Sequence, residues 1–166
     1  MVLEKSFAIG DVVQVGGTTG EVLSIDLLSV KVRTFDNLYV RIPNESLIKT
    51  EIKNLSRFPI RRYDMQVGVA YKEDLKKVSD LLIKVADAYD YSLDHPRPLI
   101  IFQGFGESSM DLQFSVWATR ENYLKVRNEL PARVKEAFDD AGIDIPFPHR
   151  TLYTGSETTP FPIRTE

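Results

Sequence analysis

Short strand-like segments fill the first third of the chain. Runs rich in Val, Ile and aromatic residues alternate with turn residues, and they lie at 11–15, 20–25, 29–35 and 38–42. Asp36-Asn37 suits the positive backbone dihedrals of a hairpin turn, and Gly16-Gly17 separates the first two runs. Four or five short strands at this spacing predict a small closed β-barrel, which leaves no exposed sheet edge.

A less regular stretch joins this barrel to the rest of the chain. Asn44 is placed to cap a brief helical stretch up to Ile48, and a further strand-like run covers 52–56. Pro59 and the arginines around it then mark a change of rhythm. We therefore predict a domain boundary here. The predicted parts are a β domain at 1–59, an α/β domain at 60–149 and a terminal segment at 150–166.

The α/β domain begins with a predicted strand at 64–71 and a helix opened by Glu73 and Asp74, whose charges suit the N-terminal end of a helix. Apolar residues then recur every three or four positions and predict one buried helix face: Leu75, Val78, Leu82, Val85 and Tyr89. Two further strands, at 99–102 and 110–117, flank a predicted hairpin turn at Gly104-Phe105-Gly106.

A second helix follows, with Thr119 as its predicted N-cap and Gly142 as its C-terminal stop. Its apolar stripe consists of Tyr123, Val126, Leu130, Val134, Phe138 and Ala141. Pro131 lies inside this stripe, and an interior proline predicts a kink or a break. A last strand at 151–154 gives the order βαββαβ, in which both helices lie on one face of an antiparallel sheet.

Composition excludes several classes of protein. The chain has no cysteine and only two histidines, so thiolate zinc sites, disulfide scaffolds and imidazole chemistry have little to build on. The net charge of −3 is too small to predict electrostatic capture of nucleic acid. No apolar run approaches the roughly 18 residues of a membrane-spanning helix.

None of the candidate catalytic or ligand-binding motifs is convincing. The glycines at 16–20 lack the Lys-Ser/Thr ending and the following helix of a phosphate-binding loop, so they predict a tight turn. The carboxylate pairs at 73–74 and 139–140 are neighbours on helices and do not converge on one pocket. We therefore expect no enzyme activity, no cofactor and no metal site.

Arg57, Arg61 and Arg62 form the densest basic cluster, with Lys49 and Lys53 nearby. Small barrels can bind single-stranded nucleic acid with basic and aromatic residues. Residues 1–59, however, carry seven basic and seven acidic residues, so no electrostatic funnel exists and no nucleic-acid partner is expected.

One short motif occurs twice. Pro146-Phe147-Pro148-His149-Arg150-Thr151 is similar to Pro160-Phe161-Pro162-Ile163-Arg164-Thr165. The first copy joins the second helix to the predicted last strand, and the second lies in the Thr- and Pro-rich end of the chain. Chance and a repeated docking element both account for this repeat.

An ordered set of phrases resembles the cytoplasmic region of small-conductance mechanosensitive channels. They are Phe7-Ala8-Ile9-Gly10-Asp11-Val12-Val13, Gly17-x-x-Gly20-x-Val22, Arg33-Thr34-Phe35-Asp36-Asn37, Val40-Arg41-Ile42-Pro43-Asn44, Asn54-Leu55-Ser56-Arg57, Val67-Gly68-Val69-Ala70-Tyr71, Ala137-Phe138-Asp139-x-Ala141-Gly142-Ile143 and Ile145-Pro146-Phe147-Pro148-His149-Arg150-Thr151. Each phrase is weak alone, but the order of the whole set is specific.

The resemblance implies an α+β fold: a small Sm-like β-barrel domain, a ferredoxin-like βαββαβ domain and a C-terminal barrel strand. It also implies a homoheptamer whose copies enclose a vestibule below the pore, through which ions and small osmolytes pass. In that family, membrane tension opens the pore on osmotic downshock. The implied location is the cytoplasmic side of the cell membrane, attached to the parent's own transmembrane helices.

The resemblance also assigns candidate site residues. Pro43, Asn44 and Glu45 fall where the β domain meets the pore-lining helix, although many relatives carry a small residue at the position of Glu45. The arginines Arg57, Arg61 and Arg62 fall near the side portals of the vestibule. The terminal barrel strand would consist of Thr151, Leu152, Tyr153 and Thr154.

Only six residues precede the first matching phrase, so the membrane region of the family is missing from this sequence. We expect the chain to be a fragment of a longer channel. The alternatives are a natural soluble oligomeric relative and a small-molecule-sensing module of the same fold.

Overall fold

The computed structural model of the protein describes residues 6–150, which divide into two units. Unit 1 consists of the chain up to Arg61 together with 118–123, and unit 2 consists of 62–117 and the chain from Leu124 onward. The main chain thus leaves unit 1 two residues after the predicted boundary. The return of 118–123 to unit 1 was not predicted.

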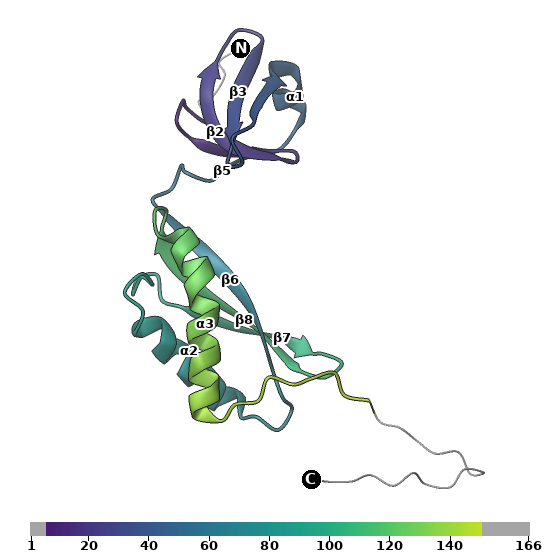
Figure 1. The fold of residues 1–166 in the computed structure, drawn as a ribbon, viewed down its shortest axis with the longest axis vertical. Coiled ribbons are helices and arrows are strands. Elements are labelled where there is room, and N and C mark those ends of the chain that lie inside the picture. The colour runs from purple at the N-terminus through teal and green to yellow at the C-terminus, as the bar shows by residue number, and fades with distance from the viewer. Residues whose placement is uncertain (1–5, 151–166) are drawn as a thin grey trace, which may run out of the picture. The chain divides into compact units, whose positions relative to one another are not determined.

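Unit 1 is built on one five-stranded antiparallel sheet in the order β4-β3-β2-β1-β5 (Figure 1). Its elements are β1 (Val12–Val15), β2 (Thr18–Ile25), β3 (Ser29–Thr34), β4 (Tyr39–Pro43), α1 (Asn44–Lys49) and β5 (Ile52–Asn54). A strand is present at each predicted run, although β3 and β5 end earlier than predicted and β4 begins and ends one residue later. Among the described residues no ladder joins β4 to β5, so the closed barrel stays a prediction.

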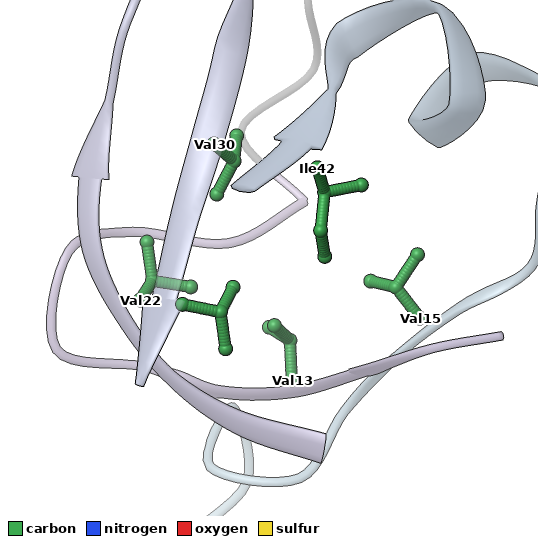
Figure 2. Close-up of a cluster of buried hydrophobic side chains, with 6 residues drawn as sticks. Val13, Val15, Val22, Val30 and Ile42 are labelled. Atoms are coloured by element: carbon green, nitrogen blue, oxygen red, sulfur yellow. The ribbon is translucent and has the colours of Figure 1, made fainter. Parts of the chain in front are cut away.

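Aliphatic side chains from four strands form the core of unit 1 (Figure 2). The buried members are Val13, Val15, Val22, Val30, Val32 and Ile42. They come from alternate positions of their strands, so each strand turns one face inward and the other to solvent. Phe7 and Leu47 pack against this core from outside the sheet.

Glycine is required at two positions of unit 1, for a different physical reason at each. Gly16 lies in the two-residue turn between Val15 and Thr18, and its φ of 55° is a conformation that L side chains rarely adopt. Gly20 lies in β2 where the paired strand β3 comes close, and a Cβ there would stand 2.3 Å from the Arg33 carbonyl oxygen. The close packing of β2 on β3 therefore requires Gly20.

Unit 2 contains most of a three-stranded sheet in the order β6-β8-β7, with two helices. Its elements are β6 (Ile60–Val69), α2 (Leu75–Asp87), β7 (Leu99–Phe105), β8 (Met110–Thr119) and α3 (Tyr123–Ala141). Alternate residues of β8 are buried, including Leu112 and Phe114, and they face the buried stripes of the helices. The helices therefore cover one face of the sheet, as the order of elements predicted.

The helix termini of unit 2 are partly as expected. Asp74 caps α2, because its side chain accepts hydrogen bonds from the backbone N–H of Lys76 and Lys77. Gly142 ends α3 at a φ of 66°, and the Ile143 N–H donates to the Phe138 carbonyl across the helix end. These three bonds confirm the predicted start of α2 and the predicted end of α3.

Three local predictions were wrong, and a fourth, a kink or a break at Pro131, was wrong as to the break. Asn44 is the first residue of α1 and does not cap it, since the N-cap is Pro43 and no side chain bonds there. Thr119 ends β8 four residues before α3 begins, so it cannot cap that helix. Gly104 lies within β7, so the hairpin turn comes later. Helix α3 runs through Pro131 without a break.

Gly20→Ala should destabilise unit 1 by about 1–3 kcal/mol, because the added methyl group overlaps the Arg33 carbonyl and must push β2 from β3. The measurement is the free energy of unfolding in urea, followed by circular dichroism.

Gly17→Ala is the matched control, because a Cβ at Gly17 meets no atom within 4 Å. A Gly20→Ala variant as stable as the Gly17→Ala variant would show that the close approach of the two strands carries no constraint.

Candidate functional site

The Asp11 carboxylate ties together the first and last strands of unit 1. It accepts hydrogen bonds from the Ala8 backbone N–H, the Asn54 side-chain amide and the Ser56 hydroxyl, each at 2.9 Å. Ser56 Oγ in turn accepts from the Val12 backbone N–H at 2.9 Å. We call Asp11, Asn54 and Ser56 the closing triad, since they join residues more than 40 positions apart.

The closing triad holds the carboxylate in its ionised form. The Ala8 N–H and the amide of Asn54 lower the pKa of Asp11 below its usual value, and Ser56 and the nearby Arg57 guanidinium act in the same direction. These contributions outweigh the partial burial of the carboxyl group, which raises its pKa. Asp11 thus serves as the hydrogen-bond acceptor for the other two members of the triad, and its role is structural.

The predicted pore-helix contact loop is organised by Asn44. The Asn44 backbone N–H donates to the Leu28 carbonyl at 3.0 Å, and its side-chain amide donates to the carbonyls of Asp26 and Leu27 at 3.1 and 2.9 Å. The start of α1 is thereby fixed to the turn between β2 and β3. Asn44 Oδ1 is buried and has no hydrogen-bond partner among the described residues.

The surface beside Asn44 is apolar. Leu27 is 92% exposed, its neighbour Leu28 in the same turn is exposed as well, and Ile48, four residues after Asn44 in α1, is 64% exposed. We call Leu27, Leu28 and Ile48 the apolar tip. Glu45, which follows Asn44 in α1, pairs with Lys49 at 2.6 Å across one turn of the helix. Because exposed leucines in adjacent positions are uncommon on isolated surfaces, the apolar tip has the character of a contact surface.

The predicted arginine cluster is divided among different partners. Arg61 lies over the ring of Tyr123, with its guanidinium carbon 3.8 Å from the ring centroid. Arg62 points away from it and pairs with Asp64, at 2.7 Å from Nε to Oδ1. Neighbouring residues of a strand face opposite sides, so the sequence cluster does not become one basic patch.

Sequence reasoning missed Arg120, which lies in the turn between β8 and α3. Its guanidinium donates to the Ser56 carbonyl at 3.0 Å, and its backbone N–H donates to the Pro59 carbonyl at 2.9 Å. Arg120 thereby holds residues 118–123 against the segment that leaves β5, within unit 1. A single arginine after a strand gives no sequence signal for such a contact.

The described residues offer little to a small ligand. Two hollows on the described residues are open to solvent, and charged side chains such as Glu73, Lys77 and Lys84 line one of them. Binding sites for small molecules are usually concave and mostly apolar, so neither hollow favours the sensing-module alternative. Residues 6–150 contain no group of three metal-ligating side chains and no helix long and apolar enough to cross a membrane. The predicted terminal-barrel strand, Thr151, Leu152, Tyr153 and Thr154, lies outside the described residues.

Two sequence families match this chain in succession. Residues 1–57 match the family described as "Mechanosensitive ion channel, beta-domain", and residues 63–145 match "Mechanosensitive ion channel MscS, C-terminal". The two matches meet within the segment that joins the two units.

Curated relatives carry the same family description. An MscS family protein of Archaeoglobus fulgidus is 32% identical over 157 residues, which are 95% of this chain and 56% of the relative. A small-conductance mechanosensitive channel of Edwardsiella ictaluri is 34% identical over 153 residues, 92% of this chain and 54% of that protein. The chain therefore spans about half the length of the curated relatives it matches.

Solved structures agree with the sequence matches. The closed-state crystal structure of Helicobacter pylori MscS superposes with a TM-score of 0.86 and 28% identity, covering 92% of this chain and 60% of that one. Wild-type MSL1 of Arabidopsis thaliana, at a TM-score of 0.74 and 16% identity, shares the fold over 86% of this chain and 52% of its own. The fold is thus a mixed α+β arrangement of antiparallel sheets like the corresponding region of MscS.

Asp11→Asn should lower the stability of unit 1 at pH 7 by about 1–2 kcal/mol, because a neutral amide accepts the bonds of the closing triad less well. The native pKa of Asp11 is lowered, so its contribution is present above the unfolded-state pKa of about 3.8 and is lost as the pH falls through the native pKa. The stability difference between the two proteins should therefore shrink below pH 4.

Urea unfolding between pH 2.5 and pH 7 measures this effect. Asp36→Asn, in the exposed turn between β3 and β4, is the control and should change stability little at any pH. A constant difference between native and Asp11→Asn proteins down to pH 2.5 would contradict a role for the ionised carboxylate.

Proposed function

Because the chain belongs to the MscS family of mechanosensitive ion channels, we propose that it forms the vestibule below the pore of a small-conductance channel. In this proposal seven copies enclose a chamber on the cytoplasmic side of the cell membrane. Membrane tension opens the pore, and ions and small osmolytes leave through the chamber on osmotic downshock. The transmembrane helices would belong to the parent protein.

The fold supports this assignment in its finer detail. The meander order β4-β3-β2-β1, with β5 returning beside β1, is compatible with an Sm-like β domain. The order β6-β8-β7 places the third strand of unit 2 in the centre, as in a ferredoxin-like βαββαβ domain. We propose that Thr151, Leu152, Tyr153 and Thr154 supply the strand of a terminal barrel shared between copies.

The apolar tip is the single observation that best supports a channel role. Three hydrogen bonds from Asn44 hold the turn that carries Leu27 and Leu28, so these exposed side chains are presented on a fixed support. Asn44 Oδ1, buried without a partner among the described residues, could accept a hydrogen bond from a docking segment. We propose that Pro43, Asn44 and Glu45, with the apolar tip, contact the pore-lining helix.

The arginines near the unit boundary are proposed to border the side portals. Arg57, Arg61 and Arg62 would then act on passing ions through the charge that their partners leave uncompensated. Arg62 is paired with Asp64, and Arg57 is near Asp11, so the bias on ion entry is expected to be small.

The vestibule proposal predicts the mass of the assembly. Seven copies of the 18.9 kDa chain give about 132 kDa, which native mass spectrometry distinguishes from smaller rings. A strictly monomeric chain at high concentration would argue against a ring that assembles without its membrane helices.

The contact assigned to the apolar tip predicts a gating defect. Leu27→Asp should leave the chain folded, because Leu27 is 92% exposed, yet it places a carboxylate in the proposed apolar contact. In a chimera that carries this chain in place of the matching region of Helicobacter pylori MscS, we expect the variant to reduce survival of osmotic downshock by about tenfold or more.

Leu124→Asp, at an exposed position on α3, is the matched control and should leave survival unchanged. The host cells lack other mechanosensitive channels, and membrane fractionation confirms equal amounts of each chimera. Equal survival with Leu27→Asp and with the native chain would remove the apolar tip from the gating contact.

A further inference from the structure

Three aromatic rings form an exposed patch on unit 2. Phe105 stacks against Tyr71 with the ring centroids 6.0 Å apart, and Phe102 meets Phe105 edge-on at 5.1 Å. The Tyr71 hydroxyl donates a hydrogen bond to the Gly106 carbonyl, which fixes the ring beside the hairpin. Phe105 is 72% exposed, and Phe102 and Tyr71 are exposed as well. We call Tyr71, Phe102 and Phe105 the aromatic patch.

The aromatic patch depends on an irregularity in β7. Phe102 pairs with Leu112 and Phe105 pairs with Met110, but Gln103 is an extra residue that has no opposite position in the register of β8. Side chains alternate along a regular strand, so residues three apart would face opposite sides. The bulge puts Phe102 and Phe105 on the same side as the buried Met110 and Leu112. The patch therefore extends the core onto an edge strand that the helices leave uncovered.

The chain after α3 passes beside the hairpin of β7 and β8 (Figure 1). The Ala70 N–H donates to the Asp144 carbonyl at 3.0 Å, and the His149 N–H donates to Ser108 Oγ at 2.9 Å. Between these two anchors lies the first Pro-Phe-Pro motif, whose Phe147 is 84% exposed. The first copy thus runs next to the aromatic patch and leaves it open.

We infer that the second copy, Pro160-Phe161-Pro162-Ile163-Arg164-Thr165, docks on the aromatic patch of its own chain. Proline-containing segments lose little entropy on binding and pack well on aromatic surfaces. Ten residues beyond Arg150 span up to about 33 Å, which is enough for the chain to return to the β7–β8 hairpin. The proposed channel function assigns no role to the chain beyond residue 154.

Tethering and charge both favour this docking. A segment joined by a short linker is present at an effective concentration in the millimolar range, so even weak contacts give appreciable occupancy. Glu107 is exposed in the turn beside Phe105 and offers a carboxylate to Arg164. The docked segment would cover the aromatic rings that the first copy leaves open.

Cysteine crosslinking tests the docking directly, because the native chain has no cysteine. The test pair is Glu107→Cys with Ile163→Cys, in the full-length chain under mild oxidation. The control pair is Asn128→Cys with Ile163→Cys, since exposed Asn128 lies near the start of α3, towards the opposite end of β8 from the hairpin. The test pair should form an intrachain disulfide about tenfold faster than the control pair, or more.

Two alanine variants distinguish docking from random collision. Phe161→Ala should slow crosslinking of the test pair several-fold, whereas Phe147→Ala, in the first copy, should leave the rate unchanged. Equal rates for the two cysteine pairs, insensitivity to Phe161→Ala, or a product formed only between two chains would each overturn the inference. Because crosslinking is measured on the purified chain, its outcome is independent of whether the parent protein conducts ions.

Discussion

The Asp11 carboxylate accepts three hydrogen bonds at once, from Ala8, Asn54 and Ser56, and it thereby joins the start of β1 to the end of β5. Strand β5 has only three residues and lies at one edge of the sheet, so its ladder with β1 is a weak anchor by itself. Asn54 and Ser56 supplement the ladder with side-chain bonds to Asp11. The Ser56 carbonyl then accepts from Arg120, so one carboxylate fixes both the end of the sheet and the path of the departing chain.

The same device appears at the other edge of the sheet. There Asn44 bonds the carbonyls of the β2–β3 turn, where no strand is available to pair with them. Buried or partly buried backbone groups need partners, and small polar side chains supply them where the ladder ends. Short sequence motifs such as Gly10-Asp11 and Asn54-Leu55-Ser56 can therefore identify the fold without being catalytic or ligand-binding residues. Their side chains supply hydrogen-bond partners at the places where the strand ladders of a small sheet end.

Periodicity was sufficient to predict the elements that bury one face, because burial imposes a repeat of two on strands and 3.6 on helices. It failed where the deciding partner is distant in sequence, as for Asn44, whose amide is used by the β2–β3 turn and not by α1. The predicted break at Pro131 is absent for another reason. An interior proline costs about 3 kcal/mol, but Val126, Leu130 and Val134 are fully buried around it, and each contributes about 1.5–3 kcal/mol. Packing therefore outweighs the lost backbone bond.

The arginines show how far a cluster in the sequence can differ from a cluster of charge. Arg62 makes a bidentate pair with Asp64, and beyond a screening length of about 8 Å such a pair is nearly neutral. Arg61 keeps its charge but lies over the Tyr123 ring, and Arg57 adds the smallest contribution to the lowering of the Asp11 pKa, which comes mainly from the Ala8 N–H. If these residues border a portal, the field that an ion meets depends on the balance of arginines with Asp11 and Asp64. A count of the arginines in the sequence therefore overestimates the positive field that an ion would meet.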